Sequence, residues 1–504
     1  MSDGLRRRVV RAVGATSVGS GLAKLISLTS TLVLVRLLTP QDFGLMAMAT
    51  TVTGLIGFFN EIGLGAAIVQ RTNVRQDEMN GCFGIAILAS VLLSLLVVAI
   101  SWPAAAFFNM PALQSLLSVL GFGFFFGALN TVPVALLRKD LRFQTVLWVG
   151  LSSSIVQALV AIPLAALGFG YWAMVVGFFV GQTVTTVWYW RVSTWRPSWP
   201  LRLREGRGLL VYGVDITYTR VLWHAYMNAD KLIIGKLMDA HAVGVYDVSR
   251  SLASLPTSQI SGLVTSIASP VFARVQADPL QLQRVQLRLS SGVAHLTFPL
   301  LAGIAVLAAE LVQVLLGNKW SEAVFPMQAL CISEAVATIT NLQAQLLIST
   351  GRVKQLVRFN LVCAIVMPLS LAAGGWFGGL PGVALAWATA YPALAIWLMR
   401  DALRASGLPA SLFWHAIRHP LLGSLVMVLA VTAARAMLAL LMAQPLLVLL
   451  SCVTVGVVVY GSYVVLVDRE GLTEIRQVLA DFGVPERVLN RWPFNRAAAP
   501  KDEL

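Results

Sequence analysis

The sequence predicts an all-α polytopic membrane protein with about 14 transmembrane helices. Of its 504 residues, 57% are hydrophobic and only 12% are charged, and the mean hydropathy is +0.77. Soluble proteins carry about 25% charged residues, so this composition excludes a soluble globular chain. The apolar stretches run for about 20 to 30 residues, and roughly 20 helical residues cross a bilayer core. They lack the alternation of a membrane β-barrel, so helices that satisfy their own backbone are expected.

An internal repeat predicts that the fold has two related halves. The polar turn at residues 35–44 is echoed at residues 235–244, where Leu37 and Gly44 recur 200 residues later. Such repeats are common in transporters. Two pseudo-symmetric six-helix bundles followed by two additional helices are therefore the expected architecture.

Each apolar stretch is expected to form one helix. The expected helices cover about 13–36, 43–69, 82–102, 113–137, 146–168, 170–190, 208–234, 242–272, 290–314, 324–350, 357–377, 380–400, 416–440 and 444–467. Glycine-rich turns at 168–170 and 378–382 join two of the pairs. The expected parts are an N-terminal lobe (1–190), an interlobe loop (191–207), a C-terminal lobe (208–403), helices 13 and 14 (404–467) and a tail (468–504).

Basic residues predict the orientation of the chain. An even number of helices places both termini on one side. The loops and ends on that side hold 29 of the 37 Lys and Arg residues, whereas the opposite loops hold Arg36, Lys236 and Lys319. Cytoplasmic loops are enriched in Lys and Arg, so both termini are expected in the cytosol. The same bias accounts for the net charge of +14 without nucleic acid as a partner.

No catalytic motif is recognisable. The chain contains no GxxxxGK[ST] phosphate loop, no HExxH and no GxSxG. Its four cysteines lie inside apolar stretches without a CxxC pair, which indicates packing residues and neither a disulfide framework nor a metal site. We therefore expect no enzyme activity, no cofactor and no metal.

Cationic side chains inside the expected helices are the best candidates for a binding site. An ionised group at mid-bilayer costs at least about 2.5–3.5 kcal/mol, so each requires a reason. Arg220, His224, Met227 and Lys231 fall on one face of the helix at 208–234. That stripe would suit an anion, because arginine binds phosphate through paired donors. The alternative is that Arg220 and Lys231 pair with acids on neighbouring helices.

Other intramembrane charges leave similar alternatives open. Lys24 lies in the middle of the first helix and either faces a central cavity or forms a structural ion pair. Arg250 either contacts a ligand or is neutralised by Asp247, three residues earlier on the same face. Glu61, Glu334 and Asp247 are candidates for binding a coupling proton or cation. The alternative is that they neutralise nearby basic residues. His295 is expected to be a packing residue.

Several motifs together resemble a known family. They are Val35–Gly44, Gly63–Arg71, Gly244–Tyr246, Ser269–Gln276 and Gly317–Trp320. In order and spacing they are similar to the bacterial polysaccharide (Wzx-type) flippases of the multidrug/oligosaccharidyl-lipid/polysaccharide superfamily, in the branch of the colanic acid and xanthan exporters. The resemblance covers nearly the whole chain.

The resemblance implies a V-shaped pair of six-helix bundles that work by alternating access. Its cargo would be an undecaprenyl-pyrophosphate-linked oligosaccharide, with membrane lipids, a polysaccharide polymerase and export proteins as partners. In related peptidoglycan-precursor flippases, basic residues on helices 1, 2 and 8 line the cavity. Lys24 and Arg250 lie on matching helices, whereas the second helix here offers Glu61 and no basic residue.

The resulting hypothesis is a flippase of the bacterial cytoplasmic membrane for exopolysaccharide or lipopolysaccharide biosynthesis. Lys24, Arg220, Arg250 and Lys231, with His224, would bind the pyrophosphate. One alternative is a multidrug or toxin extruder of the same superfamily, which would favour an aromatic and acidic cavity. The other is a membrane polymerase or ligase that acts on the same glycan.

Overall fold

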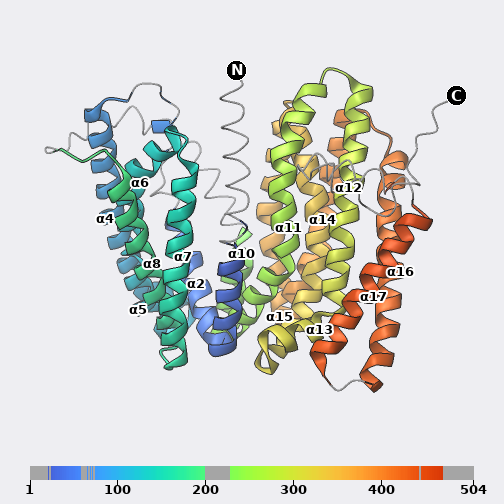
Figure 1. The fold of residues 1–504 in the computed structure, drawn as a ribbon, viewed down its shortest axis with the longest axis horizontal. Coiled ribbons are helices and arrows are strands. Elements are labelled where there is room, and N and C mark those ends of the chain that lie inside the picture. Colours follow the sequence, from blue (N-terminus) through green and yellow to red (C-terminus); the bar gives the residue numbers. More distant parts are fainter. Residues whose placement is uncertain are drawn as a thin grey trace. The chain divides into compact units, whose positions relative to one another are not determined.

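The computed structural model describes residues 21, 24–57, 65, 68–69, 71, 74–198, 227–441, 444–468 and 471. Every regular element in these ranges is a helix, which confirms the expected fold class (Figure 1). Eight helices within the described part are long and apolar enough to cross a membrane. The chain forms two compact units, one up to Asp247 and one from Val248 onward.

The first unit contains residues 24–37, which are helical, and seven labelled helices. The labelled helices are α2 (Pro40–Gly57), α4 (Gln76–Phe108), α5 (Pro111–Leu120), α6 (Gly123–Lys139), α7 (Phe143–Ala166), α8 (Tyr171–Val192) and α10 (Ala229–Leu237). Helix α11 (Ala240–Val275) begins in the first unit and continues into the second.

The second unit contains the remaining elements. They are α12 (Pro279–Val306), α13 (Ala308–Leu311), the π-helix η2 (Val312–Leu316), the 3₁₀ helix η3 (Asn318–Ala323), α14 (Val324–Ser349), α15 (Val353–Ser406), α16 (Ala410–Leu441) and α17 (Pro445–Leu466). Helices α16 and α17 pack on each other, and both contact α12. Arg435 on α16 forms an ion pair with Glu310 on α13, with Nε and Oε1 2.5 Å apart.

The two turns that the sequence matched begin their helices in the same way. Thr39 accepts a hydrogen bond from the Asp42 N–H at 3.2 Å, and the Asp42 carboxylate accepts one from the Thr39 N–H at 3.0 Å. In the second copy of the turn, at residues 235–244, the Asp239 carboxylate accepts a hydrogen bond from the Ala242 N–H at 2.8 Å. Thr39 and Asp239, which are 200 residues apart, thus bond to N–H groups of the first turn that lack an intrahelical partner.

The matched glycines let the starts of α2 and α11 touch through their backbones. A Cβ placed on Gly44 would lie 1.6 Å from the Ala240 carbonyl oxygen, and one on Gly244 would lie 1.8 Å from that of Pro40. The contact is reciprocal, so Gly44 and Gly244 occupy equivalent places. This symmetry agrees with the repeat expected from the sequence.

A second pair of glycines supports the same repeat. Gly170 before α8 has φ 55° and ψ −140°, and Gly379 has φ 58° and ψ −147°. This backbone conformation is readily available only to glycine. Gly379 breaks α15, so the helices expected at 357–377 and 380–400 are two segments that follow each other without a loop.

Two other expected helices differ from the structure in detail. The stretch 113–137 lies within a single candidate membrane span, Pro111–Lys139, which is interrupted between the end of α5 at Leu120 and the start of α6 at Gly123. The Ser94 hydroxyl donates to the Gly121 carbonyl at 2.8 Å and so satisfies a backbone oxygen at the break. The helix expected at 290–314 begins at Pro279, where the Asp278 carboxylate caps it. Hydropathy does not detect a polar first turn or a hydrogen-bonded break.

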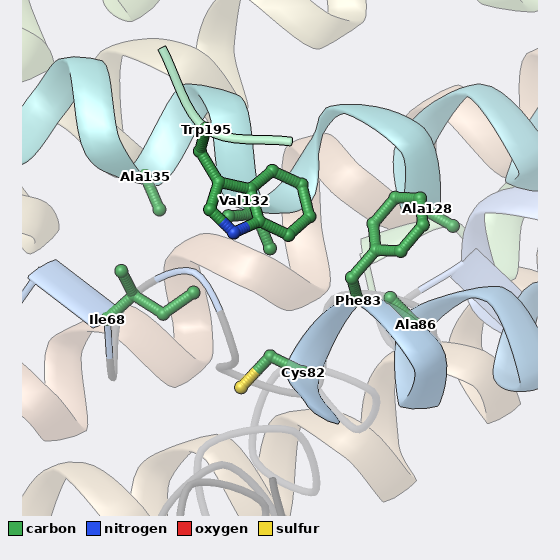
Figure 2. Close-up of a cluster of buried hydrophobic side chains, with 8 residues drawn as sticks. All are labelled: Ile68, Cys82, Phe83, Ala86, Ala128, Val132, Ala135 and Trp195. Atoms are coloured by element: carbon green, nitrogen blue, oxygen red, sulfur yellow. The ribbon is translucent and has the colours of Figure 1, made fainter. Parts of the chain in front are cut away.

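The side chains between α4 and α6 show how the first unit packs (Figure 2). Trp195 follows α8 and lies among Phe83 and Cys82 of α4 and Val132 of α6. The Phe83 and Trp195 rings meet edge to face at 5.4 Å. All four cysteines are free and buried, which agrees with their interpretation as packing residues.

Candidate functional site

An ion pair joins α10 to α11 in the first unit. The Lys231 Nζ lies 2.6 Å from the Asp247 Oδ1, and both side chains are about four-fifths buried, with exposed fractions of 17% and 24%. The pair corresponds to the alternative in which Lys231 meets an acid on a neighbouring helix. Asp247, which lies three residues before Arg250 on the same helix, thus contacts a lysine from another helix.

Asp230 is a charged residue that the sequence analysis did not consider. It is completely buried, its Oδ2 accepts a hydrogen bond from the Tyr246 hydroxyl at 2.8 Å, and its Oδ1 accepts one from the Lys231 N–H at 2.8 Å. Together with the ion pair, these contacts place a network of two acids, a lysine and a tyrosine at the junction of α10 and α11. The acidic residue directly before Lys231 was the signal that could have revealed it.

The other expected site residues in the first half of the chain are Lys24, Arg220, His224 and Glu61. Lys24 is an exposed residue in the helical segment 24–37. Arg220, His224 and Glu61 lie outside the described residues.

A second polar cluster lies in the second unit. The Arg250 guanidinium carbon on α11 sits 4.8 Å from the centroid of the Trp387 ring on α15. Trp387 and Tyr391 are buried, and their rings are 5.7 Å apart. Glu334 on α14 is half-buried within electrostatic reach of Arg250.

The cluster combines chemistries that suit different ligands. A guanidinium stacked on an indole is fixed in orientation, and stacking uses its faces, whereas phosphate is bound along its N–H edges. The Glu334 carboxylate adjoins the buried Thr257 and could hold a proton or a cation. Glu334 therefore has the surroundings expected for both of its alternatives. Arg250 is a basic residue that it can pair with, and Thr257 supplies a hydroxyl beside a candidate proton or cation site. Among the residues with described positions, no group of three His, Cys, Asp or Glu could hold a metal ion.

Comparison with known proteins extends the interpretation to the whole chain. Residues 33–325 match the model of a family described as polysaccharide biosynthesis protein. A relative in Escherichia coli (strain K12), the lipopolysaccharide biosynthesis protein WzxC, is 22% identical over 76% of this chain and 78% of its own.

The fold is that of two solved transporters. A lipid II flippase MurJ structure superposes with a TM-score of 0.72 at 14% identity, covering 90% of this chain and 99% of that one. A multidrug resistance MATE transporter of the MOP superfamily gives 0.63 at 14% identity, covering 79% and 98%. These proteins are transporters rather than enzymes, as the sequence led us to expect. The chain is therefore a multi-pass membrane protein that belongs to the polysaccharide biosynthesis protein family.

Proposed function

We propose that this protein is a flippase that moves undecaprenyl-pyrophosphate-linked oligosaccharide repeat units across the bacterial cytoplasmic membrane. It would serve exopolysaccharide or lipopolysaccharide biosynthesis, in the branch of the colanic acid and xanthan exporters. Family membership and the flippase-like fold support the class of cargo. A polysaccharide polymerase and export proteins would take up the units that it delivers.

The single observation that carries the proposal is the stacking of Arg250 on Trp387. An arginine in an apolar helix is costly, and here an indole face fixes the planar guanidinium. This orientation suits bidentate binding of a pyrophosphate oxygen pair. Lys24, Arg220, His224 and Lys231 would add positive charge for the same group.

Transport against a gradient needs a source of energy, such as the downhill movement of a proton or cation. Acidic residues are the side chains that bind such an ion. Glu334 is our first candidate for a coupling proton or cation, because it lies beside Thr257 and near Arg250. Asp247 and Glu61 are further candidates. Cation binding at Glu334 would compete with its attraction to Arg250 and so link the ion to the cargo site.

The architecture that we propose follows the sequence. Residues 1–190 and 208–403 form two six-helix lobes, joined by a loop at 191–207, and they alternate between inward and outward access. Residues 404–467 supply two further helices with lipid-facing surfaces for the polyprenyl chain. The tail at 468–504 and the N-terminus lie in the cytosol.

The test uses a strain that lacks the gene and carries wild type, Arg250→Ala or Arg250→Lys. Mass spectrometry of polyprenyl-linked intermediates and their accessibility in spheroplasts are measured, together with protein level in the membrane. We expect complete repeat units to accumulate on the cytoplasmic face with Arg250→Ala, and only partial relief with Arg250→Lys, which keeps the charge but loses the planar fork. Arg284→Ala, which changes an exposed arginine on α12, serves as the matched control.

The rival functions give different results in the same strain. Single units exposed on the periplasmic face would place the block after translocation and replace the flippase with a polymerase or ligase. Normal intermediates with loss of resistance to organic cations would indicate a drug extruder, for which Glu334 and the aromatic pair would be the binding groups.

A further inference from the structure

A buried polar cluster joins α12 to the end of α17, separate from the residues proposed for transport. His295 of α12 and Asp468, which follows α17, have exposed side-chain fractions of only 1% and 8%. The His295 Nε2 lies 3.1 Å from the Asp468 Oδ2. His295 is buried, as expected of a packing residue, but its neighbours are polar.

Pro299 fixes the direction of one hydrogen bond in this cluster. In a helix, the carbonyl of His295 would accept from the N–H of residue 299, but proline has none. The Tyr460 hydroxyl on α17 donates to this carbonyl instead, at 3.2 Å. A hydroxyl has one proton to donate, so the Tyr460 oxygen acts as acceptor in its other contact.

That other contact is with the imidazole. The Tyr460 oxygen lies 3.0 Å from the His295 Nδ1. Because the hydroxyl proton is used on the carbonyl, the hydrogen between Nδ1 and Tyr460 belongs to the imidazole. A neutral imidazole with hydrogen on Nδ1 has a lone pair on Nε2, and that lone pair would face the Asp468 carboxylate. A ring that donates both to Tyr460 through Nδ1 and to Asp468 through Nε2 must carry hydrogen on both nitrogens.

The surroundings close the contact from water. The Asp468 Oδ1 accepts the Gly471 N–H at 2.9 Å. A Cβ on Gly471 would lie 2.5 Å from the His295 Nε2 and 2.7 Å from the Asp468 Oδ2. The backbone of residue 471 therefore covers the two atoms, and a side chain at this position would intrude on them.

The charge of Asp468 is secured by its partners. Burial raises the pKa of Asp468. The hydrogen bonds from His295 and from the Gly471 N–H, together with the charges of His295 and His419, lower it by more, so the pKa of Asp468 lies below its ordinary value. Asp468 thus stays ionised at all pH values above the ordinary range of an aspartate.

Other ionisable groups of the described chain face the pair from α16 and α17. His419 on α16 acts on Asp468, and the Arg418 Nε donates to the His419 Nε2 at 3.3 Å. Tyr463 on α17 interacts electrostatically with Asp468 and with Arg418. On α14, the Gln343 Nε2 donates to the Ser290 hydroxyl of α12 at 3.1 Å.

We propose that His295, Tyr460 and Asp468 form a proton-binding site, in which the proton held on the His295 Nε2 ties the end of α17 to α12. Loss of one ring proton at alkaline pH leaves an imidazole that cannot donate to both Tyr460 and Asp468. One of the buried polar groups then loses its hydrogen bond, which is costly, so the connection between α17 and α12 weakens. The tie is present at lower pH and is lost as pH rises, whereas the Asp468 carboxylate is neutralised only in strong acid.

The first experiment reads the protonation state directly. Full-length protein with ¹⁵N-labelled histidine is reconstituted in lipid nanodiscs and examined by solid-state NMR at neutral pH. We expect one of the five histidines to be an imidazolium with hydrogen on both nitrogens. Its signal should vanish in His295→Gln, become that of a neutral ring in Asp468→Asn, and persist in His415→Gln, which changes an exposed histidine on α16.

The second experiment tests whether the connection between α17 and α12 stabilises the protein in a pH-dependent way. The thermal unfolding midpoint is measured between about pH 6 and 9, a range that begins near the pKa of about 6.5 that a histidine has in the unfolded chain. Wild type should lose several degrees over this range, and Asp468→Asn and Tyr460→Phe should lose less. A neutral His295 at neutral pH in wild type would overturn the proposal, as would a pH slope in Asp468→Asn equal to that of wild type. Neither readout requires transport activity, so this proposal and the flippase proposal can fail separately.

Discussion

At the scale of single residues, the charges inside this membrane protein are accompanied by specific neighbours. Lys231 meets Asp247, Arg435 meets Glu310, and Arg250 stacks on Trp387. Each contact lowers the cost of holding a charge among apolar helices. A partner does not by itself decide between structure and function, because a paired lysine can still be shared with an anionic ligand. To tell a structural role from a role in ligand binding, both members of an ion pair must be replaced together.

Lys231 and Asp247 provide such a test. Lys231→Ala should destabilise the protein by about 1–3 kcal/mol, since it leaves a mostly buried carboxylate without its lysine. The double variant Lys231→Ala/Asp247→Ala should recover most of this loss, as measured by thermal unfolding in detergent. If the double variant is stable and transports, the pair is structural. If it is stable and cells accumulate lipid-linked units, Lys231 belongs to the cargo site.

At the scale of elements, the starts of α2 and α11 meet through a close backbone contact. The capping groups Thr39 and Asp239 begin the two helices, and Gly44 and Gly244 allow the helices to touch. The Asp42 carboxylate also accepts the Tyr171 N–H at 3.0 Å, which ties α2 to the start of α8. One polar turn therefore organises three helices, and its sequence is constrained by backbone geometry.

Methyl groups at the two glycines test this contact. Gly44→Ala and Gly244→Ala should each lower stability by about 1–3 kcal/mol, because the added carbon has no space beside a carbonyl. Gly150→Ala is the matched control, since a Cβ there meets no atom within 4 Å. Thermal unfolding of the three purified variants gives the comparison. Equal midpoints for Gly44→Ala and Gly150→Ala would contradict the close contact.

At the scale of the whole molecule, the distribution of basic residues is the strongest guide to orientation. Electrostatic bias during insertion keeps Lys- and Arg-rich loops in the cytosol. The turn between α11 and α12 and the turn before α15 should lie on that side, together with both termini. The 3₁₀ helix η3, which begins at Asn318, should lie on the other side.

Cysteine labelling checks this topology. The native cysteines are buried, so a membrane-impermeant maleimide should react only with a new thiol. We expect Ala277→Cys and Arg352→Cys to react only after the inner membrane is opened, and Asn318→Cys to react in intact spheroplasts. All three positions are exposed. The reverse pattern would invert the orientation and place the basic loops outside.

The sequence by itself determined the membrane class, the helical fold and the repeat. These properties follow from composition and from residue spacing, which act locally and are therefore visible in a single chain. It also identified the glycine turns at Gly170 and Gly379, because a positive φ restricts the residue type. It did not predict the breaks within helices or the starts with polar first turns, which depend on capping and on bonds from neighbouring helices.

Only the tertiary structure decided how the charges are paired. Asp247 was near Arg250 in sequence, yet Lys231 contacts it from another helix. Asp230, Tyr246, His295 and Asp468 belong to polar networks whose members are far apart along the chain. The physical reason is that a buried charge is satisfied by whichever group packing brings within about 3 Å. That choice depends on helix packing, which hydropathy and spacing do not encode.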